Sequence, residues 1–399
     1  MQSFFPIVRL AVTGVILALA FGYVPAVAQD EVPAEAPKLA EDIHETIAKV
    51  PVTVTMLSGK QHSGQMIVTH FRPTGNGPFP VVIFNHGRAS VKEKRATTPR
   101  FRYTGIARFW VRRGFAVFVP TRLGYGETGL DPDPEFAGNA CNDRKFEVPV
   151  AVMTRQIAAT LDFAKSLAWA DGKRVIVAGQ SYGGLGSIAA GGEKWPGVIA
   201  VINFAGGGGG DPEKRPMQPC SPLHLASIYA AIGRKAAVPT LWLYADNDKY
   251  WGAEWPRAWH AAYTKAGGRA QFVGFSAVSD DGHNLLSSGF SFWRPAVDDF
   301  LAKSGIRPAP KSRDAPPATS FARLDEADKL PHVKAEVKTD GYQKFLRADV
   351  PRAFAIGPKG SWAWRTDETA PADALARCAQ IGKQPCQLYA VDDAVVWKP

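Results

Sequence analysis

Charge and sulfur are scarce in this 399-residue chain: charged residues make up 21% of it, and it holds only four cysteines and five methionines. Hydrophobic residues reach 46%, so the chain can bury a sizeable core, which excludes a wholly disordered protein. The composition also excludes a fibrous repeat and a multi-span membrane protein. We find no internal repeat and expect two or more domains.

Basic residues outnumber acidic ones by 47 to 37, which gives a formal net charge of +10. Such an excess can indicate a nucleic-acid or membrane-surface partner. The charges are spread along the chain without a basic tail or a nucleic-acid-binding motif, so no nucleic-acid partner is expected. Residues 88–113 nevertheless hold nine basic side chains and one acid. We favour a solvated surface there; the alternative is a segment that attracts an anionic substrate or associates weakly with an anionic envelope surface.

The first 28 residues have the three-part pattern of a secretory signal peptide. Arg9 precedes an apolar run at 10–23, and Ala26-Val27-Ala28 supplies the small residues of a cleavage site. A proline and two glycines within the run 10–27 disfavour the alternative, an uncleaved membrane anchor. We expect an exported protein, periplasmic or secreted, that loses residues 1–28.

The four cysteines show neither a Cys-x-x-Cys pair nor a cluster with histidine at zinc spacing, so no metal site is expected. In an oxidising compartment an even number of cysteines indicates disulfides. Sequence proximity favours a bond between Cys378 and Cys386, which leaves Cys141 to pair with Cys220. Four cysteines allow three pairings, and free buried thiols are the alternative.

Between residues 52 and 304, short runs rich in β-branched residues alternate with longer helical patterns. We expect strands, the first two antiparallel, at 52–56, 65–71, 81–85, 115–120, 175–178, 198–204, 240–245 and 271–275. Helices are expected near 103–113, 150–168, after 184, and near 222–232, 255–266 and 295–304. This alternation predicts a mostly parallel sheet covered on both faces, with its chemistry at the carboxyl ends of the strands.

The composition also divides the rest of the chain. Residues 29–51 form an N-terminal segment before the domain at 52–304, and residues 305–320 are a linker rich in proline and charge. Residues 321–399 are expected to form a separate small α+β module. A hairpin over 353–365, a helix at 372–379 and a strand at 387–391 are its predicted elements.

A candidate nucleophile lies in residues 179–183 (GQSYG), which match the Gly-x-Ser-x-Gly pattern. The motif follows a predicted buried strand and precedes a predicted helix, the context in which a strained turn holds a serine hydroxyl above a sheet. We therefore expect Ser181 to be a nucleophile. The alternative is a glycine-rich strand-to-helix turn without chemistry.

A nucleophilic serine needs a histidine base and an acid that orients it, in the chain order serine, acid, histidine. Among the histidines after Ser181, His283 lies in a polar loop after a strand and is favoured over His224, His260 and His332. For the acid we favour Asp248, three residues beyond the end of the strand 240–245, over Asp246. The latter is expected to cap the turn.

An oxyanion needs preorganised N–H donors. We expect these from the backbone of Tyr182 and from the loop at Gly87 and Arg88, with Arg88 as the favoured donor. His86 is expected to fix this loop.

Two irregular stretches, 125–145 and 206–222, leave strands near the expected site and carry Cys141 and Cys220. A disulfide would join them as a partial lid. The five glycines at 206–210 are interpreted as a flexible segment rather than a phosphate-binding loop. The aromatic residues that we expect to contact a substrate are Tyr125, Tyr250 and Trp251.

Taken together, HG (86–87), RxGYG (122–126), GQSYGG (179–184), ADND (245–248) and DGH (281–283) resemble the α/β-hydrolase superfamily. The resemblance covers about residues 50–303 and is nearest to the exported, dienelactone-hydrolase-like branch. It implies the α/β-hydrolase fold and hydrolysis of a small-molecule ester. Dienelactone hydrolases use a cysteine nucleophile, whereas this chain has Ser181, which favours an esterase-like activity. The C-terminal module resembles one found on some exported bacterial hydrolases.

The sequence thus predicts a serine hydrolase of carboxylic esters that needs no cofactor. Two alternatives are a serine peptidase of related fold and an envelope binding protein with a vestigial hydrolase site.

Overall fold

The computed structural model describes residues 38–89, 91–306, 315–348, 350–366 and 369–399. The expected signal peptide at 1–28 lies outside these residues. The chain divides into two compact units, residues 1–38 and 39–399, and the elements described below all belong to the second. Among the described helices, none has both the length and the apolar character needed to cross a membrane.

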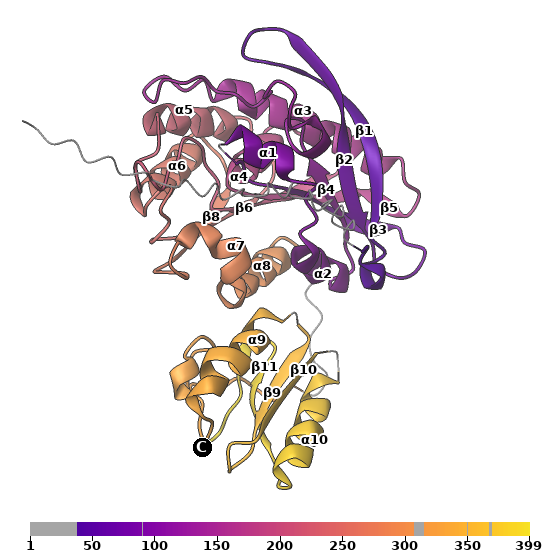
Figure 1. Ribbon diagram of the computed structural model, residues 1–399, viewed down its shortest axis with the longest axis vertical. Coiled ribbons are helices and arrows are strands. Elements are labelled where there is room, and N and C mark those ends of the chain that lie inside the picture. Colours follow the sequence, from indigo (N-terminus) through magenta and orange to yellow (C-terminus); the bar gives the residue numbers. More distant parts are fainter. Residues whose placement is uncertain (1–37, 90, 307–314, 349, 367–368) are drawn as a thin grey trace, which may run out of the picture. The chain divides into compact units, whose positions relative to one another are not determined.

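An eight-stranded sheet organises the larger part of the second unit (Figure 1). Its strands are β1 (Thr46–Thr55), β2 (Gln61–Phe71), β3 (Phe79–Asn85), β4 (Ala116–Thr121), β5 (Ala170–Gln180), β6 (Val198–Phe204), β7 (Thr240–Ala245) and β8 (Ala270–Phe275). They lie in the order β1-β2-β4-β3-β5-β6-β7-β8. Both partners of β2 run antiparallel to it, and the strands from β4 to β8 are parallel. The predicted mostly parallel sheet is confirmed.

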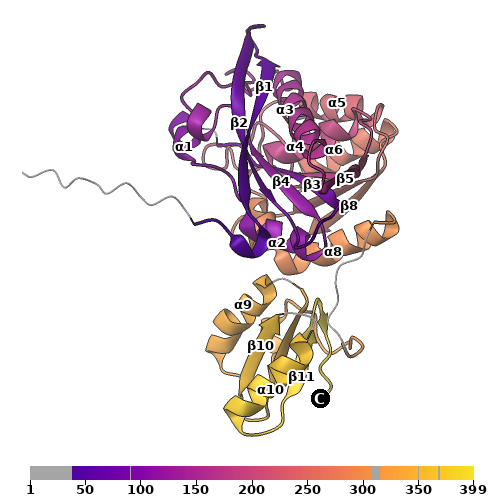
Figure 2. The same ribbon diagram turned by 90° about the vertical axis from the view of Figure 1, so that its right-hand side faces the viewer.

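Alternate side chains of the strands enter two hydrophobic cores, one on each face of the sheet. In β3, Val81 and Ile83 join the first core, and Val82 and Phe84 join the second. The first core lies under α3 (Glu147–Lys165), α4 (Tyr182–Gly191), α5 (Pro222–Gly233) and α6 (Glu254–Lys265). The second lies under α2 (Thr104–Arg112), α7 (Leu285–Ser288) and α8 (Phe290–Lys303). Figures 1 and 2 show these two groups of helices on opposite sides of the sheet. Burial on both faces explains why the strands have unbroken hydrophobic sequences.

Several elements differ from the sequence-based expectation; β2 and α8 begin at Gln61 and Phe290 rather than at 65 and 295. Strand β1 begins at Thr46 rather than at 52, so part of the segment 29–51 belongs to the sheet. The cause is Pro51, which ordinarily argues against a strand interior but is tolerated here because β1 is an edge strand. Strand β5 begins at Ala170 rather than at 175, because it includes a polar, partly exposed start. A short helix, α1 (Lys92–Thr97), lies in the basic segment 88–113, ahead of the helix expected near 103–113.

The C-terminal residues build a separate four-stranded antiparallel sheet in the order β10-β9-β11-β12. Its elements are α9 (Tyr342–Arg347), β9 (Arg352–Ile356), β10 (Trp362–Thr366), α10 (Ala370–Gly382), β11 (Gln387–Val391) and β12 (Ala394–Val395). This sheet has its own hydrophobic cluster on each face. The predicted hairpin, helix and strand of an α+β module are therefore present, and α9 was not anticipated.

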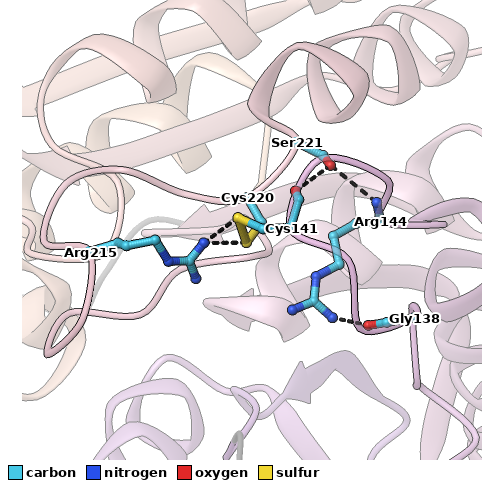
Figure 3. The surroundings of a disulfide bond; sticks show 6 residues. All are labelled: Gly138, Cys141, Arg144, Arg215, Cys220 and Ser221. Atoms are coloured by element: carbon cyan, nitrogen blue, oxygen red, sulfur yellow. Dashed lines mark hydrogen bonds between the residues drawn. A yellow bond between two sulfur atoms is a disulfide. The ribbon is translucent and has the colours of Figure 1, made fainter.

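Both favoured disulfides are present: Cys141 is bonded to Cys220, and Cys378 to Cys386. There is no free cysteine among the residues that the structure describes. The first bond, drawn in Figure 3, joins the irregular stretches that follow β4 and β6. The second closes a short loop after α10 within the C-terminal module.

A buried carboxylate fixes the start of β1. The Glu45 side chain is fully buried and accepts hydrogen bonds from the Arg100 guanidinium (2.7 Å), from Arg102 Nε (2.7 Å) and from the Ala40 N–H (2.7 Å). Burial alone would raise the pKa of Glu45, but the hydrogen bonds from Arg102, the Ala40 N–H and Arg100 outweigh it and lower the pKa from 4.5 to about 2. The ionised form of Glu45 thus ties β1 to the segment that precedes α2.

This ion pair should make stability depend on pH below about 5. Because the pKa of Glu45 is lower in the folded state, its contribution of roughly 3 kcal/mol is complete above the ordinary pKa and is lost as pH falls towards 2. Urea unfolding of wild type and Glu45→Gln from pH 7 to pH 2 should therefore show a difference in unfolding free energy that shrinks with acidification. Glu193→Gln, at an exposed position, is the control. A constant difference for Glu45→Gln would contradict the assignment.

Candidate active site

Ser181 occupies a strained turn between β5 and α4. Its backbone lies at φ 56° and ψ −124°, which a residue with a side chain rarely adopts. A Cβ added at Gly183 would overlap the carbonyl oxygens of Asn85 and His86, and one added at Gly179 would overlap the carbonyl of Gly183. The glycines of the motif are thus required because the turn packs directly against the end of β3.

The structure brings the three predicted residues Ser181, His283 and Asp248 into one hydrogen-bonded chain. Ser181 Oγ lies 3.0 Å from His283 Nε2, and His283 Nδ1 lies 3.0 Å from Asp248 Oδ2. Asp248 is fully buried, and His283 is 8% exposed. Nδ1–H donates a hydrogen bond to the Asp248 carboxylate, which leaves Nε2 as the acceptor for the serine hydroxyl.

Hydrogen bonds from neighbouring groups fix the positions of Asp248 and His283. The second carboxylate oxygen of Asp248, Oδ1, accepts the N–H groups of Tyr250 (2.8 Å) and Trp251 (3.1 Å). His283 lies in a short 3₁₀ helix (Gly282–Asn284) capped by Asp281, which accepts the N–H groups of His283 (3.0 Å) and Lys249 (2.9 Å). Asp281 therefore joins the loop after β7 to the loop after β8.

The alternative candidates lie elsewhere. Asp246 accepts a hydrogen bond from Arg257 at the surface (2.7 Å). The exposed His224 pairs with Glu147 (3.0 Å), and His260 contacts the Ala270 carbonyl (3.3 Å). His332 belongs to the C-terminal module and packs near Trp397.

The loop after β3 faces the serine. A Cβ added at Gly87 would lie 3.3 Å from Ser181 Cβ and 3.8 Å from Ser181 Oγ, so the loop backbone approaches the hydroxyl closely because Gly87 has no side chain. Among the described residues, none accepts the backbone N–H of Arg88 or of Tyr182. These two groups are available as donors beside the serine.

A buried arginine that the sequence analysis did not assign holds this loop. Arg122 donates hydrogen bonds to the carbonyls of His86 (2.7 Å) and Gly87 (3.4 Å) and pairs with the buried Glu135. Its backbone N–H donates to His86 Nε2 (3.1 Å), so Nδ1 carries the proton and donates to the Gly87 carbonyl (2.6 Å). Burial and the Arg122 charge hold the pKa of His86 well below its ordinary value. His86 thus helps to fix this loop, as predicted. Arg122 could have been found from the sequence, because it is the first residue of the RxGYG motif (122–126).

The three aromatic residues expected to contact a substrate lie near the histidines. Tyr250 is partly exposed and stacks on the His283 ring, with 3.9 Å between centroids. Trp251 is buried, and its indole N–H donates to the Ala205 carbonyl (2.8 Å). Tyr125 is 2% exposed and meets the His86 ring edge-on; its buried hydroxyl has no partner among the described residues.

Most charges of the basic segment 88–113 are neutralised within the protein. At least six of its nine basic side chains are paired with carboxylates: Arg88 and Arg95 with Asp133, Arg100 and Arg102 with Glu45, Arg108 with Asp42, and Arg113 with Asp298. The segment is therefore mainly a set of ion pairs that attach it to other elements.

The order of the candidate site residues along the sheet identifies the architecture. The serine follows β5 at a strained turn into a helix, the acid follows β7, and the histidine follows β8, in the chain order serine, acid, histidine. The chain has the α/β-hydrolase fold. The fold expected from the sequence is thus confirmed.

Similar solved structures belong to several kinds of hydrolase. A Klebsiella pneumoniae protein named as a dienelactone hydrolase is 16% identical, with a TM-score of 0.41 over 65% of this chain and 99% of its own. An acetyl xylan esterase from Paenibacillus sp. R4 is 18% identical, with a TM-score of 0.43 over 65% of this chain and 89% of its own. A Pyrococcus horikoshii acylaminoacyl peptidase is 11% identical, with a TM-score of 0.44 over 67% of this chain and 43% of its own.

No protein-family model and no curated protein matches the chain. Within the described residues, the structure contains no group of three or more His, Cys, Asp or Glu side chains placed to hold a metal ion.

The packing at the serine turn can be tested by adding one methyl group. Gly183→Ala should lower the unfolding free energy by roughly 2 kcal/mol, because the new Cβ meets backbone oxygens that cannot rotate away. Gly105→Ala in α2 is the control, since its Cβ would have no neighbour nearer than 3.9 Å. Denaturant unfolding gives both values, and equal stabilities of the two variants would refute this account.

Proposed function

We propose that the protein is an exported serine hydrolase that cleaves carboxylic esters through an acyl-enzyme intermediate. The observation that carries the proposal is the chain from Ser181 Oγ through His283 to Asp248, with both links at 3.0 Å and the serine on a strained turn. A serine hydroxyl is a weak nucleophile without such a base, and this arrangement supplies one.

In the proposed reaction, Ser181 attacks the ester carbonyl while His283 Nε2 takes the hydroxyl proton. Asp248 holds the imidazole in its orientation and stabilises the imidazolium. The N–H groups of Tyr182 and Arg88 bind the oxyanion of the tetrahedral intermediate. His283 then donates its proton to the leaving alcohol, and afterwards it removes a proton from the water that hydrolyses the acyl-enzyme.

Other observations support parts of the proposal. Tyr250 stacks on His283 and remains partly exposed, so it is positioned to contact a bound acyl group. We also assign Tyr125 and Trp251 to the surroundings of the substrate. The two disulfides are consistent with the export that the sequence at 1–28 predicts.

The central test is an assay of short and medium p-nitrophenyl esters together with labelling by a fluorophosphonate. Wild type should hydrolyse the esters and be labelled at Ser181, and Ser181→Ala should lose the label and at least 10³-fold in kcat. Ser227→Ala, an exposed serine of α5, is the matched control. Absence of both turnover and label would favour the envelope binding protein. Labelling with turnover only of peptide substrates would favour the peptidase.

The role of Asp248 can be tested separately from that of Ser181. Asp248→Asn preserves the shape of the side chain but removes the charge that orients His283, so kcat should fall by roughly 10³ to 10⁴. Asp246→Asn, whose side chain binds Arg257 at the surface, should remain within about twofold of wild type. If the two variants were equally active, Asp248 would not be the orienting acid. Steady-state kinetics on one ester are sufficient.

A further inference from the structure

Strand β10 forms an open edge of the C-terminal sheet, and Figures 1 and 2 show α10 beside it. The opposite edge, β12, is two residues long, and its Val395 carbonyl accepts the backbone N–H of Thr319 (2.8 Å). In the large sheet, edge strand β1 carries Pro51 and the exposed Lys49. Proline and lysine discourage another chain from pairing with an edge. The sequence of β10, WAWRT, contains neither, and its one charged residue is Arg365.

The backbone of β10 presents unpaired N–H groups along this edge. β10 pairs with β9 in an antiparallel register that continues a hydrogen bond from the Gly357 N–H to the Ser361 carbonyl (2.8 Å). In such a pair, every second residue bonds to the partner strand. Counting from Ser361, the residues that direct N–H and C=O away from β9 are Trp362, Trp364 and Thr366. No described residue accepts any of these three N–H groups.

A groove of about 680 Å³ runs along the same edge. It is lined by every residue of β10 and by Arg377 and Ile381 of α10. These two helical residues are four positions apart, so they share one face of α10, and both are exposed. A groove between an edge strand and a helix is suited to binding an extended peptide, which adds to the sheet as a further strand.

Close packing fixes one end of this groove. A Cβ added at Gly382, the last residue of α10, would lie 2.2 Å from Ser361 Oγ, and one added at Gly357 would lie equally close to it. Ser361 Oγ also lies 3.6 Å from Cys378 Sγ, which is bonded to Cys386. The end of α10 is therefore held against the start of β10. Since the groove is preformed, a peptide can occupy it without paying to order its walls.

The two faces of β10 offer different chemistry. Trp362 and Trp364 are partly exposed and pack against the hydrophobic cluster under α9. Ala363 lies on the opposite face, in the cluster that contains Cys378 of α10. Arg365 shares the face of Ala363, because alternate residues of a strand point the same way. An added strand would thus meet tryptophans on one face and an arginine on the other.

Two guanidinium groups give the α10 side of the groove a positive charge. Arg365 donates to the Trp364 carbonyl (2.8 Å), and Arg377 donates to Gln380 Oε1 (2.6 Å). Neither has an ion-pair partner in the part of the chain that the structure describes. Carboxylates bind guanidinium groups through strong, charge-assisted hydrogen bonds. The α10 side is therefore complementary to acidic side chains.

The acids closest in sequence do not occupy these arginines within the described residues. Asp373 precedes Arg377 by one turn of α10 and accepts the Thr369 hydroxyl (2.7 Å). Asp367 and Glu368 lie outside the described residues. The test below uses the full chain, so both acids are in place when binding is measured.

The charge also decides against a second copy of this strand as the occupant. Pairing β10 with another β10 would bring the Arg365 and Arg377 groups of both copies to one edge, where like charges repel. A strand with aspartate or glutamate would form attractive pairs at the same positions.

We propose that the edge of β10 binds an extended segment of a partner protein in which acidic and apolar side chains alternate. The segment adds to the C-terminal sheet as a fifth strand, and its carbonyls accept the three outward N–H groups of β10. Its acidic side chains pair with Arg365 and Arg377, and its apolar side chains pack on Trp362 and Trp364. This inference does not depend on the proposed ester hydrolysis.

Fluorescence anisotropy with two labelled, end-capped peptides tests the site. One short peptide alternates valine with glutamate, and the other alternates valine with lysine. The protein is the full chain with Ser181→Ala, so that a serine-dependent reaction cannot consume the probe. The glutamate peptide should bind about tenfold more tightly than the lysine peptide. This preference should weaken as salt is raised, because screening reduces the attraction between exposed charges.

Removing both cations should abolish the preference. Arg365→Gln combined with Arg377→Gln should weaken binding of the glutamate peptide about tenfold, the value of two exposed ion pairs. Arg155→Gln combined with Arg347→Gln removes the same charge from exposed positions of α3 and α9 and should leave binding within about twofold.

A backbone substitution tests strand addition itself. Thr366→Pro removes one outward N–H and should weaken binding of the glutamate peptide about fivefold, the value of one hydrogen bond. Proline is tolerated on an edge strand where the missing N–H would face solvent. Thr366→Val keeps the N–H and the shape of the side chain, so it should bind within about twofold of the parent. The arginine variants keep the test decisive if the proline variant does not fold.

The outcomes separate this proposal from its alternatives. Binding of neither peptide, or equal binding of both, would overturn the acidic occupant. Equal losses in Thr366→Pro and Thr366→Val would overturn strand addition. Light scattering that shows a dimer of the parent and a monomer of Thr366→Pro would assign the edge to a second copy instead. Ester hydrolysis by the chain with Ser181 intact is measured separately, so either conclusion can fail alone.

Discussion

The contact between the serine turn and the end of β3 is the constraint on which the site depends. Gly183 lies so close to the carbonyls of Asn85 and His86 that the turn and the loop after β3 cannot move independently. The position of Ser181 therefore also sets the distance from its hydroxyl to the Arg88 and Tyr182 N–H groups. A strained backbone persists only where its surroundings over-determine it, and here β5, α4 and β3 together do so.

A buried ion pair between Arg122 and Glu135 reinforces that constraint. Arg122 and Glu135 are both fully buried, and such a pair contributes little net stability because both ions lose their water. Its value lies in geometry, since the same guanidinium binds two consecutive carbonyls of the loop after β3. The protein thus places an expensive interaction where small displacements would separate the N–H donors from the serine.

The sequence was sufficient to predict the alternation of strands and helices, the turn that carries Ser181 and the residues now found around it. These features depend on local patterns and on the order of residues along the chain. It failed where partners are distant in the chain. Pro51 concealed the start of β1, since an edge position cannot be read from a sequence. Residues 88–113 looked like exposed charge, yet their partners Glu45 and Asp298 lie far away in the chain.

The Cys141–Cys220 bond also makes residues 141–220 a covalent ring that contains β5, Ser181 and β6. A protease that cut the backbone once inside this ring would open it without releasing a fragment, because the disulfide would still connect the two new ends. Ser181 would stay attached to the part of the chain that carries Asp248 and His283. In a compartment rich in proteases, such a nicked molecule would keep all three side chains in one covalent piece.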